Sequence, residues 1–390
     1  MDAKKEQIGQ AVDALADELF TVSKYLLENP ETAYEEFKAC DYLSRFLAER
    51  DFDVEKACGG VETAFLANPT GCAPSNPKVA ILAEYDALPK IGHGCGHNLI
   101  AAAGVGAAVA LRRVLGDDAG AITMVGTPAE EGGGGKQLLA DAGIFKDCDA
   151  AMMFHPGQQN LIGQETLGRT KFTLEFFGKT AHAAAGPDQG INALDAMIAT
   201  FNGISAFRQQ MRADGRVHGV ITHGGDAPNI IPDYTSALFY VRGATREYRD
   251  VIFDRVQKIA EGAALGAGAT YKIEVAKPVA ALDPMKRNDA LEEAVGVNME
   301  FLGATPEVAS PDVGSSDIGN LSHYLPSIQP FLAICDTDIN IHSVEFAAAT
   351  QSERGQTAML NAAKMLAMTA YDFLNQPELR KSAAAEFAGN

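Results

Sequence analysis

The sequence predicts an α/β protein in which helices flank a mostly parallel sheet and a smaller α+β domain of ferredoxin-like type is inserted. Apolar runs of strand length alternate with helical stretches in the first half of the chain. Between residues 169 and 278 the pattern changes to a β-α-β-β-α-β order. With 390 residues, the chain is also longer than a typical single domain built around one hydrophobic core. We therefore expect a discontinuous domain of residues 1–168 plus 279–390, with residues 169–278 inserted as a second domain.

Helices are predicted where apolar residues recur at helical spacing. The first such helix covers residues 8–26, and a second covers residues 34–50. Residues 99–111 are apolar but too few to span a membrane, which favours a buried helix. A helix over residues 351–374 returns to the first domain, and residues 375–390 are predicted to form a loosely held tail.

Four apolar runs of strand length each lead to polar side chains that are able to do chemistry. The runs are Val79–Ala83, Ala121–Val125, Ala150–Phe154 and Phe331–Ile334. The polar residues that follow them include Glu84, Asp86, Glu130, Glu131, His155 and His342. Because ligands of parallel sheets bind beyond the carboxyl ends of the strands, we expect these side chains to meet at one edge of the sheet.

The inserted segment is predicted to hold four strands and two helices. The strands are Lys171–Phe176, Val217–Thr222, Thr235–Val241 and Thr270–Val275, and the helices cover residues 192–211 and 248–264. The alternation of apolar and polar residues in the first of these strands indicates a sheet with one open face.

The composition limits the kinds of partner. A hydrophobic content of 47% with 21% charged residues is typical of a folded globular chain. The formal net charge of −19 argues against nucleic acid or an anionic membrane as a partner. The chain starts without the apolar core of a signal peptide, and its six cysteines lack the spacing of a disulfide framework. A reducing cytoplasm is therefore expected.

The segment Gly92-His93-Gly94-Cys95-Gly96-His97-Asn98 places two imidazoles and a thiol within five residues. Side chains two apart in an extended segment point the same way, so His93, Cys95 and His97 could address one point. Thiolate and imidazole are ligands that zinc and similar cations prefer. A free cysteine in a glycine-rich turn is the other interpretation of this pattern.

The pair Glu130-Glu131 follows a predicted buried strand and precedes four glycines, residues 132–135. A hydrolytic metal site needs ligands, an open position for water and a base, and two neighbouring glutamates can divide the roles of ligand and base. A pair of solvated surface carboxylates is the alternative. No hydroxyl residue follows Lys136, as the magnesium site of a phosphate-binding loop would require, which argues against a nucleotide site.

His155 and His342 could complete a ligand set, although a lone histidine after a strand is about as often a structural residue. The chain has no Gly-x-Ser-x-Gly motif, which argues against a serine nucleophile. A Cys95 nucleophile with His97 as its base is a stronger rival, but it leaves the two glutamates and the other two histidines unexplained.

Taken together, these motifs resemble metallopeptidase family twenty, the family of the aminoacylases, carnosinase-type dipeptidases and glutamate carboxypeptidases. The resemblance rests on residues 84–89, 92–98, 128–132 and 155–156, and it follows nearly the whole chain in order. The branch that it resembles most includes aminobenzoyl-glutamate hydrolase and β-alanyl-lysine dipeptidase. It implies a zinc-peptidase-like catalytic domain, and it implies that the inserted domain serves as lid and dimerisation domain.

Carried onto this sequence, the resemblance implies a site for two divalent metal ions. Cys95 is expected to bridge them as a thiolate, and the remaining ligands would be His97, Glu131, His155 and His342. Glu130 is expected to be the general base, and Asp86 to orient a neighbouring ligand. His93 matches a position that is not a ligand. Glu84 departs from the histidine of better-known members, and its role is left open.

In the inserted domain, His182, Asn229 and Arg242 match positions that contact substrate, the first two across a dimer. Arg242 is expected to pair with a substrate carboxylate, which suits the fixed fork of donors in arginine. Gly314 and Ser315 begin a segment that resembles a backbone cup for that carboxylate.

The resemblance therefore implies a metal-dependent amidohydrolase or dipeptidase that cleaves a small N-acyl amino acid or dipeptide carrying a free carboxylate. Thiolate and imidazole favour zinc, and manganese, cobalt or nickel stay open. A deacylase of N-acetylated or carbamoylated amines and a catalytically silent metal-binding homologue are the alternatives. The implied partners are the small substrate and a second copy of the chain, in a homodimer or a higher oligomer.

Overall fold

The computed structural model describes residues 3–308 and 314–389, and it divides into two compact units. One unit runs to Glu165 and resumes at Met285, and the other is Thr166–Pro284. Each unit has its own hydrophobic core. The predicted domain limits at residues 169 and 278 stay a prediction.

The first unit is built on a six-stranded sheet in the order β1-β2-β4-β3-β5-β14. Its strands are β1 (Phe52–Lys56), β2 (Phe65–Pro69), β3 (Val79–Ala83), β4 (Ile122–Gly126), β5 (Ala150–Met152) and β14 (Ser327–Ile328). The strands from β4 to β14 run parallel, whereas β1 and β2 form an antiparallel edge beside β4. The predicted α/β class with a mostly parallel sheet is confirmed, and the antiparallel edge was not predicted.

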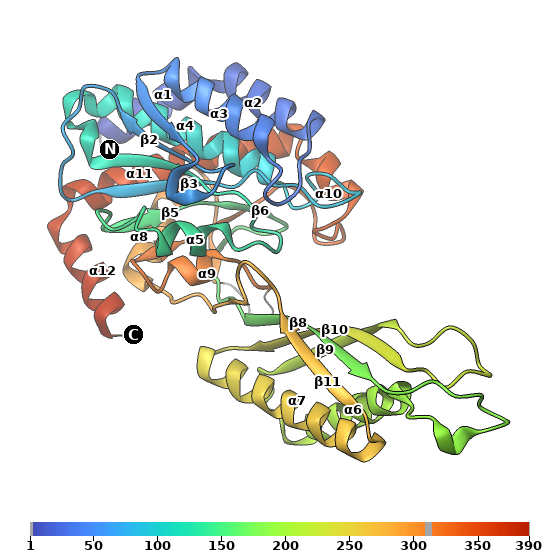
Figure 1. The fold of residues 1–390 in the computed structure, drawn as a ribbon. Helices are drawn as coiled ribbons and strands as arrows, with labels where there is room; N and C mark the ends of the chain where they lie inside the picture. Colours follow the sequence, from blue (N-terminus) through green and yellow to red (C-terminus); the bar gives the residue numbers. More distant parts are fainter. Residues whose placement is uncertain (1–2, 309–313, 390) are drawn as a thin grey trace. The chain divides into compact units, whose positions relative to one another are not determined.

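Helix α4 (His97–Leu115) packs on β3 and β4, where its apolar residues 99–111 are all buried (Figure 1). By length and composition, the stretch His97–Ala121 could cross a membrane, but 72% of its apolar window lies inside the unit. Small side chains suit this crowded position because α4 also contacts other helices of the unit. The helices that flank it are α1 (Ala3–Asp13), α2 (Ala16–Glu28), α3 (Phe37–Ala48) and α11 (Glu353–Asn375). The single helix predicted over residues 8–26 is thus two helices.

A second sheet of four short strands lies in the same unit, in the order β13-β7-β15-β6. Its strands are β6 (His155–Gly157), β7 (Leu161–Ile162), β13 (Glu307–Val308) and β15 (Phe331–Ala333). The run Phe331–Ile334 therefore pairs beside His155 and does not extend the main sheet. The chain changes sheets between Met152 and His155, which apolar patterning alone does not reveal.

The prediction of a loose tail at residues 375–390 is wrong for the described residues 377–389, which form a helix. Pro377 starts helix α12 (Pro377–Gly389), as proline in a first helical turn often does. Ala383 is buried, and its carbonyl oxygen accepts a hydrogen bond from Asn288 Nδ2 at 2.8 Å. Tertiary contacts hold this helix, which has little apolar periodicity of its own. The unit is completed by α5 (Gly135–Asp141), α8 (Asp289–Phe301), α9 (Ile318–Leu321) and α10 (Val344–Ala349).

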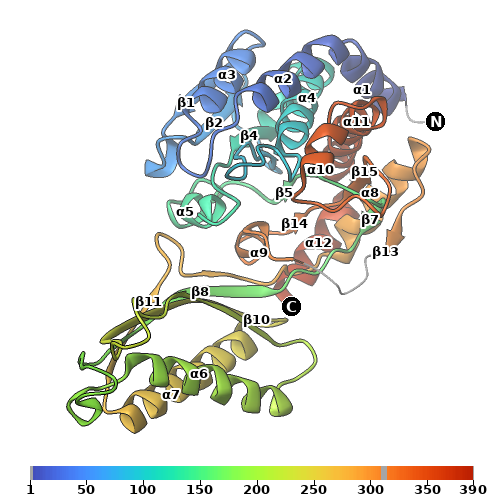
Figure 2. The same cartoon turned by 90° about the vertical axis from the view of Figure 1, so that its right-hand side faces the viewer.

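The second unit has the predicted β-α-β-β-α-β order and the sheet order β11-β8-β10-β9 of a ferredoxin-like fold. Its strands are β8 (Gly168–Phe177), β9 (Arg216–His223), β10 (Tyr234–Gly243) and β11 (Thr270–Val275), with β12 (Ala281–Leu282) also paired to β8. Helices α6 (Ala193–Phe207) and α7 (Arg246–Ala267) cover one face of the sheet (Figure 2). Alternate residues such as Phe172, Leu174 and Phe239 pack against these helices. The other residues of each strand therefore form an open face.

Glu292 in α8 provides a test of how burial affects stability in the first unit. Burial raises the pKa of this carboxyl to about 7. The folded chain therefore binds more protons than the unfolded chain between about pH 4.5 and 7, and stability falls as the pH rises through this window. Glu292→Gln carries no charge at any pH. Between about pH 5 and pH 8, the free energy of unfolding of Glu292→Gln should therefore rise relative to that of wild type by on the order of 2–3 kcal/mol.

The measurement is urea unfolding of both proteins, treated with chelator, at the two pH values. Glu293→Gln is the matched control because Glu293 is the next residue and is exposed. The control should follow wild type at both pH values. A pH dependence of Glu292→Gln equal to that of wild type would contradict the assignment.

Candidate metal centre

Two glycines let the segment around Cys95 approach its neighbours closely. A Cβ on Gly94 would lie 3.2 Å from the carbonyl oxygen of the residue after His342. A Cβ on Gly96 would lie 2.5 Å from the ring of the proline after His155, and Gly96 has a φ of 80°. The Gly94 carbonyl oxygen also accepts a hydrogen bond from the backbone N–H of His342 at 2.9 Å. The absence of side chains at these two positions thus allows Cys95 to lie beside both distant histidines.

The predicted ligands meet in the first unit, although they come from four separate parts of the chain. Atoms of ligand type lie within 4.8 Å of one another in three overlapping groups. The groups are Cys95 with His97 and His155, Cys95 with Glu131 and His342, and His97 with Glu130 and Glu131. The Cys95 sulfur lies 3.4 Å from His155 Nε2. His93 is buried nearby but belongs to none of these groups of described residues.

Asp86 holds two of these residues in place. One carboxylate oxygen lies 3.0 Å from His97 Nδ1, and the other accepts a hydrogen bond from the backbone N–H of Glu131 at 2.9 Å. Burial raises the pKa of Asp86, but the charge and hydrogen bond of His97 outweigh this effect, and the net pKa is lowered. An ionised Asp86 fixes a proton on His97 Nδ1 and leaves Nε2 as an acceptor or metal ligand.

Several buried atoms at this point have no hydrogen-bond partner among the described residues. They include His97 Nε2 and Glu131 Oε1, which are 3.9 Å apart. His155 Nδ1 lies 2.8 Å from the Pro156 carbonyl oxygen, so its Nε2 is the nitrogen that faces Cys95. A buried polar atom without a partner costs about 1–3 kcal/mol. A cation bound by thiolate, imidazole and carboxylate would satisfy these atoms, so the residues fit a metal site.

The two glutamates lie on a tight turn after β4. Ala129 has a φ of 62°, and its carbonyl oxygen accepts hydrogen bonds from Gly133 and Gly134 at 3.0 and 2.9 Å. The backbone N–H of Ala129 donates to the buried carboxyl of Glu36 at 2.9 Å. Burial, followed by the charge of Asp86, raises the pKa of Glu36 to about 7. These contacts hold Ala129 in a left-handed conformation that alanine rarely adopts, and they direct the next two side chains.

Glu130 and Glu131 have different surroundings despite being adjacent. Glu130 Oε2 lies 4.0 Å from His97 Nε2, whereas Glu131 Oε1 lies 3.6 Å from His342 Nε2. Burial, and then the charges of Glu131 and Glu84, raise the pKa of Glu130 well above its usual range. A carboxyl group with a raised pKa is suited to accept and release a proton.

Glu84 belongs to a buried ion triad that the sequence analysis missed. Glu84, Lys136 and Asp317 are all fully buried. Lys136 Nζ pairs with Glu84 Oε1 and, at 2.5 Å, with Asp317 Oδ1, while its backbone N–H donates to Asp317 Oδ2 at 2.9 Å. The second oxygen of Glu84 lies 3.5 Å from His97 Nε2. A carboxylate directly after an entirely apolar strand was the one signal in the sequence that a buried counter-charge must exist.

The remaining predicted residues lie outside this cluster. Gly314 is exposed and Ser315 half-buried in the segment that leads to Asp317, and their role as a carboxylate cup stays a prediction. His182, Asn229 and Arg242 belong to the second unit. His182 is exposed, and its Nδ1 accepts hydrogen bonds from the backbone N–H groups of residues 184 and 185 at 3.2 and 3.1 Å. Its proton is therefore on Nε2, which makes this nitrogen a donor.

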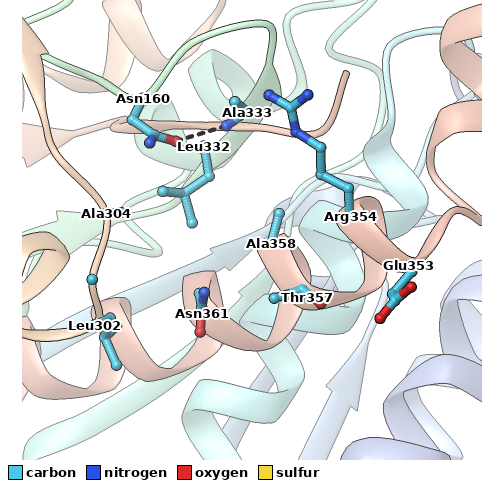
Figure 3. A pocket seen from close by; sticks show the side chains of 11 residues that line it. Asn160, Leu302, Ala304, Leu332, Ala333, Glu353, Arg354, Thr357, Ala358 and Asn361 are labelled. Atoms are coloured by element: carbon cyan, nitrogen blue, oxygen red, sulfur yellow. Dashed lines mark hydrogen bonds between the residues drawn. The ribbon is translucent and has the colours of Figure 1, made fainter. Parts of the chain in front are cut away.

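A hollow of about 470 Å³ lies elsewhere in the first unit, beside the start of α11 (Figure 3). Asn160 Oδ1 there accepts a hydrogen bond from the Ala333 backbone at 2.9 Å, and Arg354 pairs with Asp336. None of the predicted ligands lines this hollow. It is therefore separate from the metal centre.

A thiol, imidazoles and carboxylates gathered beyond the ends of parallel strands fit the chemistry of a metal-dependent hydrolase. Residues 80–369 match the family model described as Peptidase family M20/M25/M40. The chain belongs to this family, and it is a hydrolase of amide or peptide bonds. The family is metal-dependent.

Individual relatives agree with this assignment. The chain is 36% identical to Xaa-Arg dipeptidase of Mus musculus, over 99% of this chain and 93% of the relative. It is 31% identical to one of the two chains of p-aminobenzoyl-glutamate hydrolase of Escherichia coli, over 90% of this chain and 74% of the relative. Two solved structures share the fold. An aminobenzoyl-glutamate utilization protein of Klebsiella pneumoniae has a TM-score of 0.74 at 19% identity, covering 95% of this chain and 99% of that one. A dinuclear metal-binding peptidase of Bacillus subtilis has a TM-score of 0.66 at 20% identity, covering 91% and 99%.

The ion triad generates a prediction about stability. Lys136→Met leaves Glu84 and Asp317 buried without the cation between them, so the free energy of unfolding should fall by about 3–5 kcal/mol. Urea unfolding measures the loss, and Lys146→Met is the control because Lys146 is exposed. If Lys136→Met does not fold, adding Glu84→Gln and Asp317→Asn should restore folding by removing both uncompensated charges. Stability within about 0.5 kcal/mol of wild type would contradict the role of Lys136.

Proposed function

We propose that this hydrolase cleaves the amide bond of a small N-acyl amino acid or dipeptide that carries a free carboxylate, with Glu130 as the general base. The observation that carries the proposal is the convergence of Cys95, His97, Glu131, His155 and His342 around buried atoms that lack partners among residues 3–308 and 314–389. Glu130 lies beside this group with a pKa raised well above its usual range. A site that only stored metal would not require such a carboxyl group next to its ligands.

Five side chains would hold two divalent cations in this proposal. Cys95, His97 and Glu131 each belong to two of the three ligand groups, and in this proposal the sulfur of Cys95 would serve both cations. His97, Glu131, His155 and His342 would supply the other bonds. When bound, the cations lower the pKa of water toward neutrality and polarise the substrate carbonyl. Zinc suits thiolate and imidazole best, although manganese, cobalt or nickel also suit the carboxylates.

Glu130 moves the proton in the proposed reaction. Its carboxylate removes a proton from the attacking water, whose oxygen bonds to the carbonyl carbon of the substrate. The C–N bond then breaks, and Glu130 returns the proton to the departing amine. Asp86 supports this step indirectly, because its hydrogen bonds hold His97 and the Glu131 backbone in position.

The second unit would supply groups that recognise the substrate. His182 carries its proton on Nε2 at an exposed position, which supports a role in stabilising the oxyanion by a hydrogen bond. The carbonyl oxygen of Asn229 accepts a hydrogen bond from the backbone N–H of Ala183, the residue after His182, at 3.0 Å. His182 and Asn229 therefore lie on adjoining loops. Arg242 would bind the substrate carboxylate with its fork of donors, and Gly314 and Ser315 would add backbone N–H groups.

We also propose a homodimer formed through the second unit, in which His182 and Asn229 act in the site of the partner chain. Strand β9 is at the edge of its sheet, and Val220 and Ile221 on it are 58% and 39% exposed. An exposed apolar edge strand favours pairing with another chain.

We also propose a cytoplasmic location. All six cysteines are free thiols, which agrees with a reducing compartment.

Glu130→Gln and Glu131→Gln should separate the two proposed carboxylate roles. Glu130→Gln should keep its metal content but lose at least about 100-fold in kcat, because the proton acceptor is gone. Glu131→Gln should lose metal as well as activity. Metal analysis by mass spectrometry and hydrolysis of a panel of dipeptides and N-acyl amino acids measure both. Unchanged turnover in Glu130→Gln would contradict the base, and a wild type with metal but no turnover would indicate a silent homologue.

Mixed dimers test whether His182 acts across the interface. His182→Ala and Glu130→Gln chains should each be nearly inactive alone. Mixed and reassembled, they should recover about a quarter of wild-type activity, because half of randomly formed dimers are mixed and each has one intact site. His323→Ala, a histidine of the first unit that belongs to none of the ligand groups, is the control and should lose little. If the mixture stays inactive while mixed dimers form, His182 acts within its own chain.

A further inference from the structure

We propose that Arg169 and Arg242 together form a site for two carboxylates, so that the enzyme prefers substrates whose amino-acid half is acidic, as in N-acyl glutamate or aspartate. This inference rests on the proposed function, in which Arg242 binds one substrate carboxylate. It assigns Arg169 as the residue that selects the second carboxylate.

The register of the second unit's sheet places three arginines in one row. Arg242 on β10 is directly opposite Arg169 on β8 and Arg216 on β9. The neighbouring positions Thr170 and Val241 are buried, and Val241 belongs to the core that the sheet forms with α6 and α7. Because side chains alternate along a strand, the three arginines belong to the open face.

Two of the three guanidinium groups converge on one ring. The guanidinium carbons of Arg169 and Arg242 lie 5.2 and 6.0 Å from the ring centroid of Tyr240, which precedes Arg242 by two residues on the same face. Arg216 is different, because its guanidinium donates to carbonyl oxygens of its own turn, at 2.8 Å for that of Gly215. Arg216 therefore adds positive charge to the row, while Arg169 and Arg242 both lie near the ring of Tyr240.

Like charges directly opposite each other destabilise a sheet. Burial, and then the charge of Arg169, lower the pKa of Arg242. Among residues 3–308 and 314–389, no acidic side chain forms an ion pair with Arg169 or Arg216. The adjoining positions on this face, Lys171 and His218, are also basic in character. A basic surface in a chain of net charge −19 indicates a site that gathers anions.

The geometry of arginine identifies the anion. A guanidinium binds a carboxylate through two parallel hydrogen bonds, so two guanidiniums over one ring suit a ligand with two carboxylates. Glutamate and aspartate carry an α-carboxylate and a side-chain carboxylate a few bonds apart. An arginine side chain in the same place would be repelled by both guanidiniums. Substrates that end in arginine are therefore expected to be disfavoured.

The test compares three substrates with the same acyl group, ending in glutamate, glutamine and arginine. Wild type should show the highest kcat/KM for the glutamate derivative. Arg169→Gln should lower kcat/KM for that substrate by about 10- to 100-fold and change the glutamine derivative by less than about threefold. Arg169→Lys should keep part of the preference, because it retains the charge. Arg255→Gln is the matched control, since Arg255 is an exposed arginine of the same unit that also lies near an aromatic ring.

A binding arm separates this inference from the proposed function. Calorimetry should show that the metal-loaded protein binds L-glutamate more tightly than L-glutamine, and that Arg169→Gln, but not Arg255→Gln, removes the difference. An equal loss on the glutamate and glutamine derivatives, no loss on either, or a wild-type preference for the arginine derivative would overturn the role of Arg169. If no derivative is cleaved, the proposed function is overturned, and the glutamate binding of Arg169→Gln still decides the inference.

Discussion

The first unit depends on how a small number of buried carboxylates are compensated. Glu36, Glu84 and Asp86 are all at most 1% exposed, and each charge would be costly in an apolar interior without a partner. Each has a different partner. Asp86 faces His97, Glu84 faces Lys136, and Glu36 accepts a hydrogen bond from a backbone N–H and has a raised pKa. These contacts connect the ends of β3 and β4 to the segments that follow α2 and precede α9.

This arrangement explains how two of the predicted metal ligands are held in position. Asp86 uses both oxygens, one toward His97 and one toward the Glu131 backbone, so two ligands share one support. The ligand atoms that remain, His97 Nε2 and Glu131 Oε1, are buried and lack partners in the described chain. A cation bound here would supply positive charge next to these carboxylates and the thiol.

The second unit, in contrast to the carboxylates of the first, carries positively charged side chains on the sheet of its ferredoxin-like fold. Its two helices cover one face of the sheet, and its open face carries a row of arginines that the register brings together. In the first unit negative groups suit cations, and in the second unit positive groups suit carboxylates. A substrate that is both an amide and an anion needs both kinds of chemistry. The arginine row and the cluster around Cys95 each follow from the contacts within their own unit.

Much of this protein follows from local sequence pattern. The apolar runs, the buried helix after Cys95 and the β-α-β-β-α-β order of the second unit were predictable, because periodicity reports which side of an element is buried. The helix α12 and the division into two sheets were not, since long-range contacts such as Asn288 with Ala383 and His155 beside Phe331 decide them.

For the site, the sequence by itself determined which residue types were present in motifs, and a resemblance supplied their expected roles. Only the tertiary structure decided that His155 and His342 each lie beside Cys95 and that Lys136 neutralises Glu84. It also decided that the guanidiniums of Arg169 and Arg242 lie near the same tyrosine ring. The physical reason is that charge compensation and metal ligation depend on distances between atoms. Positions far apart in the chain acquire those distances only when the sheets and loops have packed.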